Sequence, residues 1–441
     1  MSRLQLKKKT NPQHRSPAIQ LEVKTILNRI QRFPGFVYTD IRLQTRRGQA
    51  DRIEITLQPH GGRRGRCSHC QRPAPGYDRL PQRSWLFVPL WHLPVFFLYA
   101  ARRVQCAEHG VAVEHLPWSD GKRPITLAMM GFLARWARHL SWRQTARSFR
   151  TSWEAVYRSI EWFVHWGLAH RQLEGVQAIG IDEIHWGKGK RADNFLTVIY
   201  QIDSHCRRLL WVGRRRTQRT LRRGLNALGP QVLGGLRFVC SDMWRAYLSV
   251  VKDRLPQTLH VLDRFHITMH LNQAVDQVRR GESSRLRGLP AAAKLKRMRW
   301  QVLGRGNRIP GRAKQRLTGL LRGQFATGRA WMLKETFRDF WRYRSLTWAR
   351  AFLDVWCARA LRSRLEPMKK VARMLRAHEE LLMNWFRAKG EISAGAVEGL
   401  NNKIRVVTRR SYGFRTYHAL EIAIYHNLGR LPEPTSTHEF C

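Results

Sequence analysis

Hydrophobic and polar residues follow patterns along this chain that change several times. Residues 51–58 (DRIEITLQ) alternate with the period of two that is typical of a half-buried strand, and a short helix is expected at Ala18–Ile30. The most apolar run, residues 85–101 (WLFVPLWHLPVFFLYAA), is broken by Pro89 and Pro94 and is too short to span a bilayer comfortably. We therefore expect strands there rather than a membrane helix.

The pattern changes again at Val176. Three short apolar strands (VQAIGIDEIHW, FLTVIYQID and RLLWVG) are followed by a helix at Gln218–Leu228 and then by a strand, a helix and a strand. This order predicts a layered α/β domain. On either side of it, residues 121–170 and 270–390 predict helices. In the second helical region, aromatic residues recur at helical steps and are expected in the core, as in Leu333–Phe337–Trp341 and Trp348–Phe352–Trp356.

Charge indicates the kind of partner. The chain has 441 residues, with 80 Lys+Arg against 31 Asp+Glu, for a net charge of +49. Such a chain repels itself unless a polyanion neutralises it, and a nucleic-acid backbone fits. An anionic membrane surface would instead predict one amphipathic helix or one polybasic tail, whereas these arginines run the whole length. The basic start MSRLQLKKKTNPQHR has no apolar core, so we expect no secretory signal, no membrane partner and a cytoplasmic location.

Three of the seven cysteines are clustered with a histidine. Cys67 and Cys70 form one knuckle and Cys106 and His109 form another with the same internal gap. Thiolates and imidazoles are the ligands that Zn²⁺ prefers, and four of them close a tetrahedral structural site. Chance pairing of buried residues is the alternative, and two matched knuckles argue against it. We expect a zinc ribbon with one structural Zn²⁺, no open catalytic position, and a hairpin over residues 85–98 between the knuckles.

Two helical segments, Trp142–Phe149 and Ser152–Phe163, are separated by a short turn. Ser152 is a suitable N-cap for the second segment. The pair suits a helix-turn-helix whose second helix enters a DNA major groove. An ordinary packed helix pair fits the spacing equally well, and the basic surroundings favour DNA. The candidate DNA contacts are Arg143, Arg147, Arg150 and Arg158.

Carboxylates at strand ends stand out because the chain has few acids. Asp182 lies within the strand AIGIDEIHW, Asp242 follows the strand RFVCS, and Glu398 lies near the start of a helix. Hard cations such as Mg²⁺ need oxygen ligands. Two such ions, about 3.5–4 Å apart, stabilise both the attacking and the leaving oxygen of a phosphodiester displacement. These three residues are therefore the candidate metal ligands.

Spacing alone leaves the ligand set open. Asp193, Asp203 and Asp263 compete as third or fourth ligands, and any single acid can be a surface salt bridge. Glu183 is excluded if Asp182 faces the metals, because neighbouring residues of a strand point to opposite sides. Polar and basic residues that follow Glu398 are expected to clamp DNA phosphates beside the metals: Asn401, Asn402, Lys403, Arg405, Arg409 and Arg410.

Three segments resemble the DDE transposases of bacterial insertion sequences, specifically the ISL3 family. They are GIDEIHWGKG, CSDMWRAYLSVVKDRLPQTLHVLDRFHI and AGAVEGLNNKIRVVTRRSYGFR. The knuckles and the helix pair fall where that family carries its own, so the resemblance covers nearly the whole chain. It implies an RNase H-like catalytic domain that is interrupted by a helical insertion before the final acid. The catalytic acids carried over are Asp182, Asp242 and Glu398, which would hold two Mg²⁺ ions, or Mn²⁺ in their place.

The same resemblance assigns a role to a histidine. The element Asp263-Arg-Phe-His266 matches a motif of the family, and it implies that His266 contacts the scissile phosphate or orders Asp242 by a hydrogen bond. A satisfied histidine of the core is the alternative reading.

The resemblance also implies an activity and its partners. The enzyme would bind the terminal inverted repeats of its element, hydrolyse the DNA ends and join the 3′-hydroxyl ends to target DNA. Double-stranded DNA and a homodimer or larger assembly on it are implied, together with a nucleoid-associated location. Two alternatives remain: a non-catalytic DNA-binding regulator that uses the zinc ribbon and helix-turn-helix, and a structure-selective nuclease that shares the RNase H-like core.

The expected domains follow one another along the chain. They are a basic arm and strand region (1–60), the zinc ribbon (61–118), the helix-turn-helix (119–170), the first part of the catalytic core (171–269), the helical insertion (270–390), the second part of the core with Glu398 (391–430) and a tail (431–441).

Overall fold

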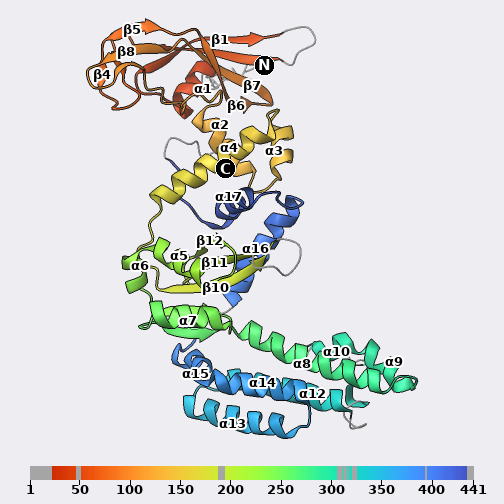
Figure 1. Cartoon of the computed structure of the whole chain (residues 1–441). Helices are drawn as coiled ribbons and strands as arrows, with labels where there is room; N and C mark the ends of the chain where they lie inside the picture. Colours follow the sequence, from red (N-terminus) through yellow and green to blue (C-terminus); the bar gives the residue numbers. More distant parts are fainter. Residues whose placement is uncertain are drawn as a thin grey trace, which may run out of the picture. The chain divides into compact units, whose positions relative to one another are not determined.

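The computed structural model describes residues 22–45, 51–186, 194–304, 325–392 and 395–434, with residues 311, 315 and 317–319. The expected basic arm, the start of the first helix and Asp193 lie outside the described residues. The chain divides into two compact units (Figure 1). Unit 1 is residues 1–169 with 432–441, and unit 2 is residues 170–431. None of the described helices is both long and apolar enough to cross a bilayer.

Unit 1 begins with helix α1 and a four-stranded sheet in the order β1-β2-β7-β6. Strand β2 pairs antiparallel with β1 and parallel with β7. Its alternation is that expected from the sequence, because Ile53, Ile55 and Leu57 are buried while the residues between them are more exposed. Their core includes the fully buried Trp85 and Trp118. The bounds are α1 Val23–Ile30, β1 Phe36–Gln44, β2 Arg52–Pro59, β6 Arg83–Leu90 and β7 Leu93–Tyr99.

Two small sheets carry the Cys/His knuckles. One pairs β3 with β4, and the other has the order β5-β8-β9. The hairpin expected between the knuckles is present as β6–β7, but it belongs to the four-stranded sheet because β7 pairs with β2. One sheet therefore combines β1 and β2, which precede residue 60, with β6 and β7, which lie between the two knuckles. The bounds are β3 Gly65–Arg66, β4 Pro73–Ala74, β5 Gly76–Arg79, β8 Arg102–Cys106 and β9 Gly110–Val113.

Helices α2 (Leu127–Trp136), α3 (Trp142–Ser148) and α4 (Trp153–His170) follow. Each helix begins at a hydroxyl side chain that accepts a backbone N–H, as N-caps do. Thr126 starts α2, Ser141 forms a capping box at α3, and the expected cap at Ser152 is confirmed by the 3.0 Å bond from the Ala155 N–H.

Unit 2 contains a five-stranded sheet in the order β12-β11-β10-β13-β14. The three sequential apolar segments form the strands expected of them and pair as antiparallel neighbours, and β13 and β14 add in parallel to β10. The bounds are β10 Ala178–His185, β11 Phe195–Ile202, β12 Arg207–Arg214, β13 Phe238–Ser241 and β14 Leu259–Leu262.

Helices cover both faces of this sheet. Gly180 lies against Val397 of α16, whereas Ile181 packs in a core with residues of α5 and α7. Because successive strand residues point to opposite faces, α16 and the α5–α7 group lie on opposite sides of β10. The bounds are α5 Gln218–Leu228, α6 Pro230–Gly234, α7 Arg245–Arg254, α16 Gly395–Arg410 and α17 Tyr417–Leu428.

A helical region lies between β14 and α16, as the sequence predicts. It packs around its own core, which includes Phe337 and Trp356, and the Asn384 side chain ties it to the sheet by donating to the His260 carbonyl at 2.7 Å. Trp348 departs from the expected core pattern because it is 67% exposed at the start of α13. The bounds are α8 Arg264–Arg285, α9 Pro290–Arg297, α10 Arg299–Leu303, α12 Ala326–Phe337, η3 Arg338–Arg342, α13 Leu346–Arg362, α14 Glu366–Ala377 and α15 Glu379–Arg387.

Candidate functional site

Three aspartates lie at the same edge of the five-stranded sheet. Gly180 of β10 pairs with Cys240 of β13, so Asp182, two residues further along β10, lies level with Asp242 just beyond β13. Ser241 of β13 in turn pairs with Leu262 of β14, which brings Asp263 to the same edge. The parallel pairing of β10, β13 and β14 therefore gathers acids that are far apart in sequence.

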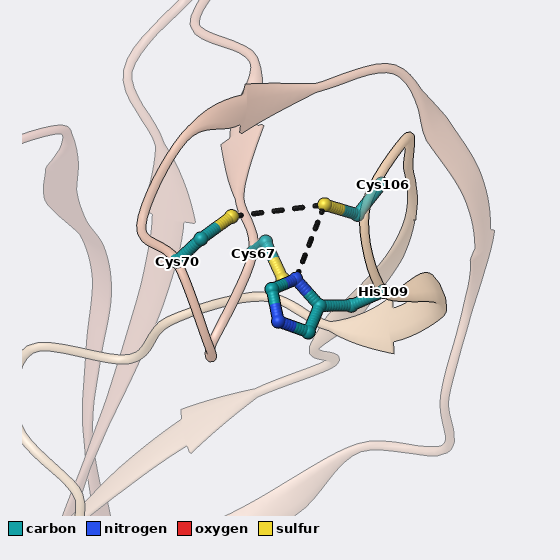
Figure 2. Close-up of side chains that lie close together, drawn as sticks. All are labelled: Cys67, Cys70, Cys106 and His109. Carbon is teal, nitrogen blue, oxygen red and sulfur yellow. Dashed lines mark hydrogen bonds between the residues drawn. The ribbon is translucent and has the colours of Figure 1, made fainter.

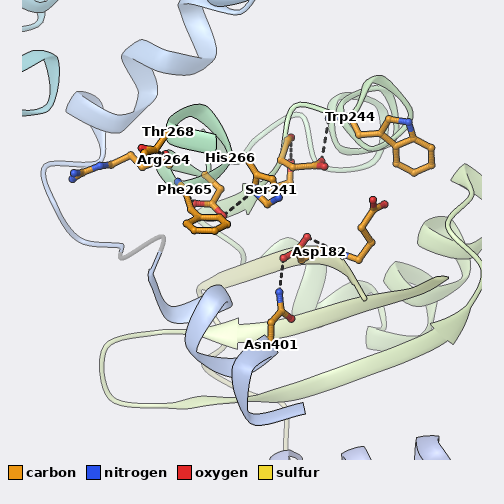
Figure 3. Close-up of polar contacts among 11 residues, drawn as sticks. Asp182, Ser241, Trp244, Arg264, Phe265, His266, Thr268 and Asn401 are labelled. Carbon is orange, nitrogen blue, oxygen red and sulfur yellow. Dashed lines mark hydrogen bonds and ion pairs between the residues drawn. The ribbon is translucent and has the colours of Figure 1, made fainter. Parts of the chain in front are cut away.

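Asp182 is held in one orientation inside the protein. Asp182 is buried, with only 7% of its surface exposed. One carboxylate oxygen accepts the Glu183 N–H at 2.7 Å, and the other accepts the side-chain amide of Asn401 from α16 at 2.5 Å (Figure 3). The hydroxyl of Tyr200 donates to the Asn401 oxygen at 2.7 Å, which fixes the amide as a donor toward Asp182.

The electrostatics of Asp182 favour a nearby cation. Burial raises the pKa of its carboxyl to about 6, and the charge of Asp242 adds to this rise. The two hydrogen bonds and the charge of His266 lower the pKa but do not cancel the effect of burial. A positive ion beside the two carboxylates would relieve their repulsion and favour the ionised form of Asp182.

Asp242 and the histidine are positioned by the loops that follow the strands. The Trp244 N–H donates to Asp242 at 3.0 Å. Asp263 caps α8 by accepting the Phe265 N–H, and its other oxygen lies 3.1 Å from Nδ1 of His266 (Figure 3). Nδ1 of His266 is therefore held by Asp263, and a role of His266 at the scissile phosphate or in ordering Asp242 stays a prediction.

The acids around His266 favour its protonated form. Burial by itself lowers the pKa of the imidazole, but the bond to Asp263 and the charges of Asp182, Asp263 and Asp242 outweigh burial and raise the pKa to about 9. The ring is half-buried. The raised pKa makes His266 a suitable hydrogen-bond donor near the aspartates at this edge of the sheet.

Glu183 contacts different partners from Asp182, as strand alternation requires. It forms an ion pair with Arg216, whose guanidinium stacks 4.2 Å from the ring centre of Phe195 and 5.2 Å from that of Trp244. Burial raises the pKa of Glu183 despite this pair. The Glu183–Arg216 pair therefore supports the Trp244 loop that carries Asp242.

Glu398, expected as the third acid, lies on the helix that contacts Asp182. It lies half-buried in the first turn of α16, and the residue of that helix that reaches Asp182 is Asn401, one turn later. Within the described residues, the carboxylates do not form a group of three whose ligand atoms all lie within 4.8 Å of one another. Of the competing acids, Asp203 is buried and accepts a hydrogen bond from Gln201 just beyond β11, a strand antiparallel to β10.

Asn401 has a role that the sequence pattern missed. The residue was expected to clamp phosphates, but it is buried and bonds to Asp182. It lies three positions after Glu398, and this spacing puts both on one side of a helix. The spacing of Glu398 and Asn401 was the feature of the sequence that could have indicated a place for Asn401 beside the acids.

The Cys/His knuckles do come together, as expected. The ligand atoms of Cys67, Cys70, Cys106 and His109 all lie within 4.8 Å of one another (Figure 2). The sulfurs of Cys70 and Cys106 are 3.7 Å apart, and the Cys106 sulfur is 3.7 Å from Nδ1 of His109. Tetrahedral zinc with bonds of about 2.3 Å to sulfur requires a sulfur–sulfur separation of about 3.8 Å, so the four residues fit a Zn²⁺ ion.

The thiol chemistry agrees with this fit. The contact with His109, together with backbone N–H groups of Glu108 and His109, lowers the pKa of Cys106 to about 6. A thiolate is the form that binds zinc. His69 stacks on His109 with ring centres 5.0 Å apart and lies outside the four-residue group.

The expected DNA-contact residues are mostly exposed. Arg143, Arg147, Arg150 and Arg158 all reach solvent on α3, α4 and the turn between them, and Arg158 pairs with Glu154 at 2.7 Å. On α16, the exposed residues are Asn402, Lys403, Arg405 and Arg409. Arg410 differs, because it is half-buried and donates to Asn427 at 3.1 Å, and burial lowers its pKa.

Comparison with known proteins is consistent with this arrangement. The family model of ISL3 transposases, described as "Transposase", matches residues 179–424. The transposase for insertion sequence element IS1557 of Mycobacterium tuberculosis is 27% identical over 399 residues, which cover 85% of this chain and 88% of that protein. The transposase for insertion sequence element IS1001 of Bordetella parapertussis is 25% identical over 331 residues, or 74% and 80% of the two chains. The chain belongs to the ISL3 family of insertion-sequence transposases.

Proposed function

We propose that this transposase cleaves the ends of its own insertion sequence and joins them to target DNA through an RNase H-like core. The sheet order β12-β11-β10-β13-β14 supports this assignment, with three antiparallel strands followed by two parallel ones. The helical region between β14 and α16 is the insertion that interrupts such a core. The observation that carries the proposal is the buried Asp182 lying level with Asp242 at the carboxyl edge of parallel strands.

We further propose that Asp182, Asp242 and Glu398 hold two Mg²⁺ ions, with Mn²⁺ as a substitute. The donors are hard oxygens, and the raised pKa of Asp182 next to Asp242 fits a site that is completed by cations. Glu398 would supply the third carboxylate from the first turn of α16. When bound, the ions would supply charge stabilisation to the attacking and leaving oxygens of phosphoryl transfer.

The protein's own residues then orient the reacting DNA. Asn401 and the Glu183 N–H hold the Asp182 carboxylate so that it cannot rotate away. The protonated His266, anchored by Asp263, is a suitable donor to a non-bridging oxygen of the scissile phosphate. The basic residues on the outside of α16 would hold the DNA backbone next to this edge.

The binding modules are proposed to act on the element's ends. The zinc ribbon would hold one structural Zn²⁺, and the α3–α4 pair would form a helix-turn-helix that contacts the terminal inverted repeats. Pairing of two DNA ends calls for a homodimer or a larger assembly on DNA.

A direct assay tests the proposed activity. Purified protein with Mg²⁺ or Mn²⁺ is incubated with a duplex that contains one end of the element, and strand cleavage is followed on a denaturing gel. Cleavage at the element's end supports the proposal, and no cleavage with either ion favours a non-catalytic regulator.

A second assay tests joining, in which pre-cleaved ends are mixed with plasmid DNA. Joined products are expected, and cleavage without joining would indicate a nuclease instead.

Replacement of Asn401 by alanine tests the positioning of Asp182. We expect cleavage to fall by roughly 10- to 100-fold, as is typical when a hydrogen-bond partner of a metal ligand is removed. The Mg²⁺ concentration for half-maximal cleavage should also rise. Asn226→Ala is the matched control, because Asn226 is exposed and accepts a bond from Arg254 rather than touching Asp182. Equal cleavage by the Asn401 and Asn226 variants at saturating protein would contradict this role.

Replacement of Arg147 by alanine tests the helix-turn-helix. Loss of one phosphate contact is expected to weaken end binding and to reduce the slope of log affinity against log salt by about 0.9. Binding is measured by fluorescence anisotropy over a range of salt concentrations. Arg123→Ala serves as the control, since its charge is already paired with Asp120 at 2.6 Å. An unchanged slope for Arg147→Ala would remove it from the interface.

A further inference from the structure

The outward face of α16 is basic and begins beside the candidate catalytic site. Its inward face is apolar apart from Asn401, with Val397, Leu400 and Ile404 buried against the sheet. The exposed positions, in chain order, are Asn402, Lys403, Arg405, Val406 and Arg409. A strip of positive charge therefore runs along the helix away from the level of Asp182.

The helix ends in a turn that fixes the next side chain in space. The N–H of Gly413 donates to the Thr408 carbonyl at 2.9 Å, and the N–H of Tyr412 donates to the Arg409 carbonyl at 3.0 Å. This pair of bonds is the Schellman motif, in which the residue after the C-cap adopts the left-handed conformation. Here that residue is Tyr412, with φ of +54°, and Gly413 follows with φ of +93°.

Tyrosine is an unfavourable choice for the fold at this position. Glycine or asparagine normally occupies it, because a side chain with a Cβ is strained in the left-handed region. Tyr412 is also 98% exposed, so its ring buries almost no surface that would offset the strain. The ring thus contributes little to folding in this structure, and a backbone outlier with an exposed aromatic side chain indicates a contact outside the chain.

Charge identifies the partner. Tyr412 follows the basic strip along the chain, and the exposed Arg409 and Arg415 lie three residues before and after it. At a rise of 1.5 Å per residue, the eleven positions from Asn401 to Tyr412 correspond to roughly 16 Å. Base pairs are spaced by about 3.4 Å, so a duplex lying along the strip from Asp182 would pass Tyr412 within about five base pairs of the cleaved phosphate.

We propose that Tyr412 is a DNA wedge, whose ring inserts at a base step of the duplex while Arg409 and Arg415 hold the flanking phosphates. Aromatic rings stack on any base, and apolar wedges at base steps partly unstack the bases and kink the duplex. The inference rests on the proposed function only in taking double-stranded DNA as the substrate. It adds a DNA contact that is separate from the metal-binding acids.

Photocrosslinking tests the contact directly. The full-length protein is mixed with an element-end duplex in which 5-bromouracil replaces thymine, irradiated, digested and analysed by mass spectrometry. A crosslink on Tyr412 is expected, because the ring lies against a base. Absence of any crosslink in the peptide that contains Tyr412, while other peptides crosslink, overturns the proposal.

Three variants distinguish the effect of the Tyr412 ring on DNA binding from its effect on the stability of the turn. Tyr412→Phe retains the ring and is expected to bind the end duplex like the wild type. Tyr412→Asn suits the left-handed backbone, so its melting temperature should equal or exceed that of the wild type, whereas its affinity should fall by roughly 5- to 150-fold. Trp348→Ala removes an aromatic side chain that is 67% exposed in the helical region and is expected to leave the affinity unchanged.

The outcomes distinguish this inference from the proposed function. Wild-type affinity for Tyr412→Asn overturns the wedge, whatever the cleavage assay gives. Crosslinking at Tyr412 by a wild-type protein that cleaves no DNA end upholds the wedge and removes the catalytic proposal.

Discussion

Replacement of Asp182 by asparagine is expected to abolish DNA cleavage while leaving the fold and end binding intact. The substitution removes a negative charge that a pair of metal ions needs, and such ions contribute several kcal/mol to the transition state. Since each 1.36 kcal/mol is a factor of ten in rate, the loss is expected to be at least roughly 10³-fold. Single-turnover cleavage of the end duplex with Mg²⁺ measures it, and anisotropy measures binding.

The stability of this variant provides the control. Asp182 has a folded-state pKa of about 6, above the ordinary 3.8. The native state therefore holds more protons than the unfolded state between these values, so the metal-free wild type loses stability as the pH rises from about 4 to about 6. The asparagine variant lacks this effect, and its melting temperature at pH 7 without metal should equal or exceed that of the wild type. Lower stability together with lost cleavage would point to misfolding instead.

The same assay decides the role of Glu398. If Glu398 completes the site, Glu398→Gln should lose cleavage to a similar extent as Asp182→Asn and Asp242→Asn. Cleavage like that of the wild type would remove Glu398 from the ligand set. Asn401 and His266 would then be the polar side chains to test next.

Loss of zinc is expected to have the second large effect. Structural zinc sites contribute apparent binding free energies of about 10–16 kcal/mol, which is comparable to the whole stability of a domain. The knuckles belong to short strands with a small core, which includes Cys67, Val104 and Cys106. Cys67→Ser should therefore bind no zinc, unfold this part of unit 1 and weaken end binding.

The measurements are metal analysis and thermal unfolding. The wild type purified without chelator should contain one zinc per chain, and a chelator should reproduce the effect of Cys67→Ser. Cys206→Ser is the matched control, because Cys206 is a free cysteine of unit 2 outside the cluster. Wild-type protein without zinc would refute the assignment.

Local sequence patterns predicted much of the fold. The alternation of residues 51–58, the three apolar strands after Val176 and the helix at Gln218–Leu228 all appear in the structure. These patterns are local because side chains repeat every two residues in a strand and every 3.6 in a helix. Trp348 is an exception to this agreement, because its spacing matched a core position although it lies exposed at the start of α13.

The sequence by itself determined which residues have the chemistry for metal and DNA: the paired knuckles, the few acids at strand ends and the excess of arginine. The tertiary structure decided which of these meet. The register of parallel strands places Asp182 beside Asp242, and the rotation of α16 on the sheet brings Asn401, 219 residues away, onto Asp182 ahead of Glu398. Contacts of this kind depend on how elements pack in three dimensions, and no periodicity within one element specifies that packing.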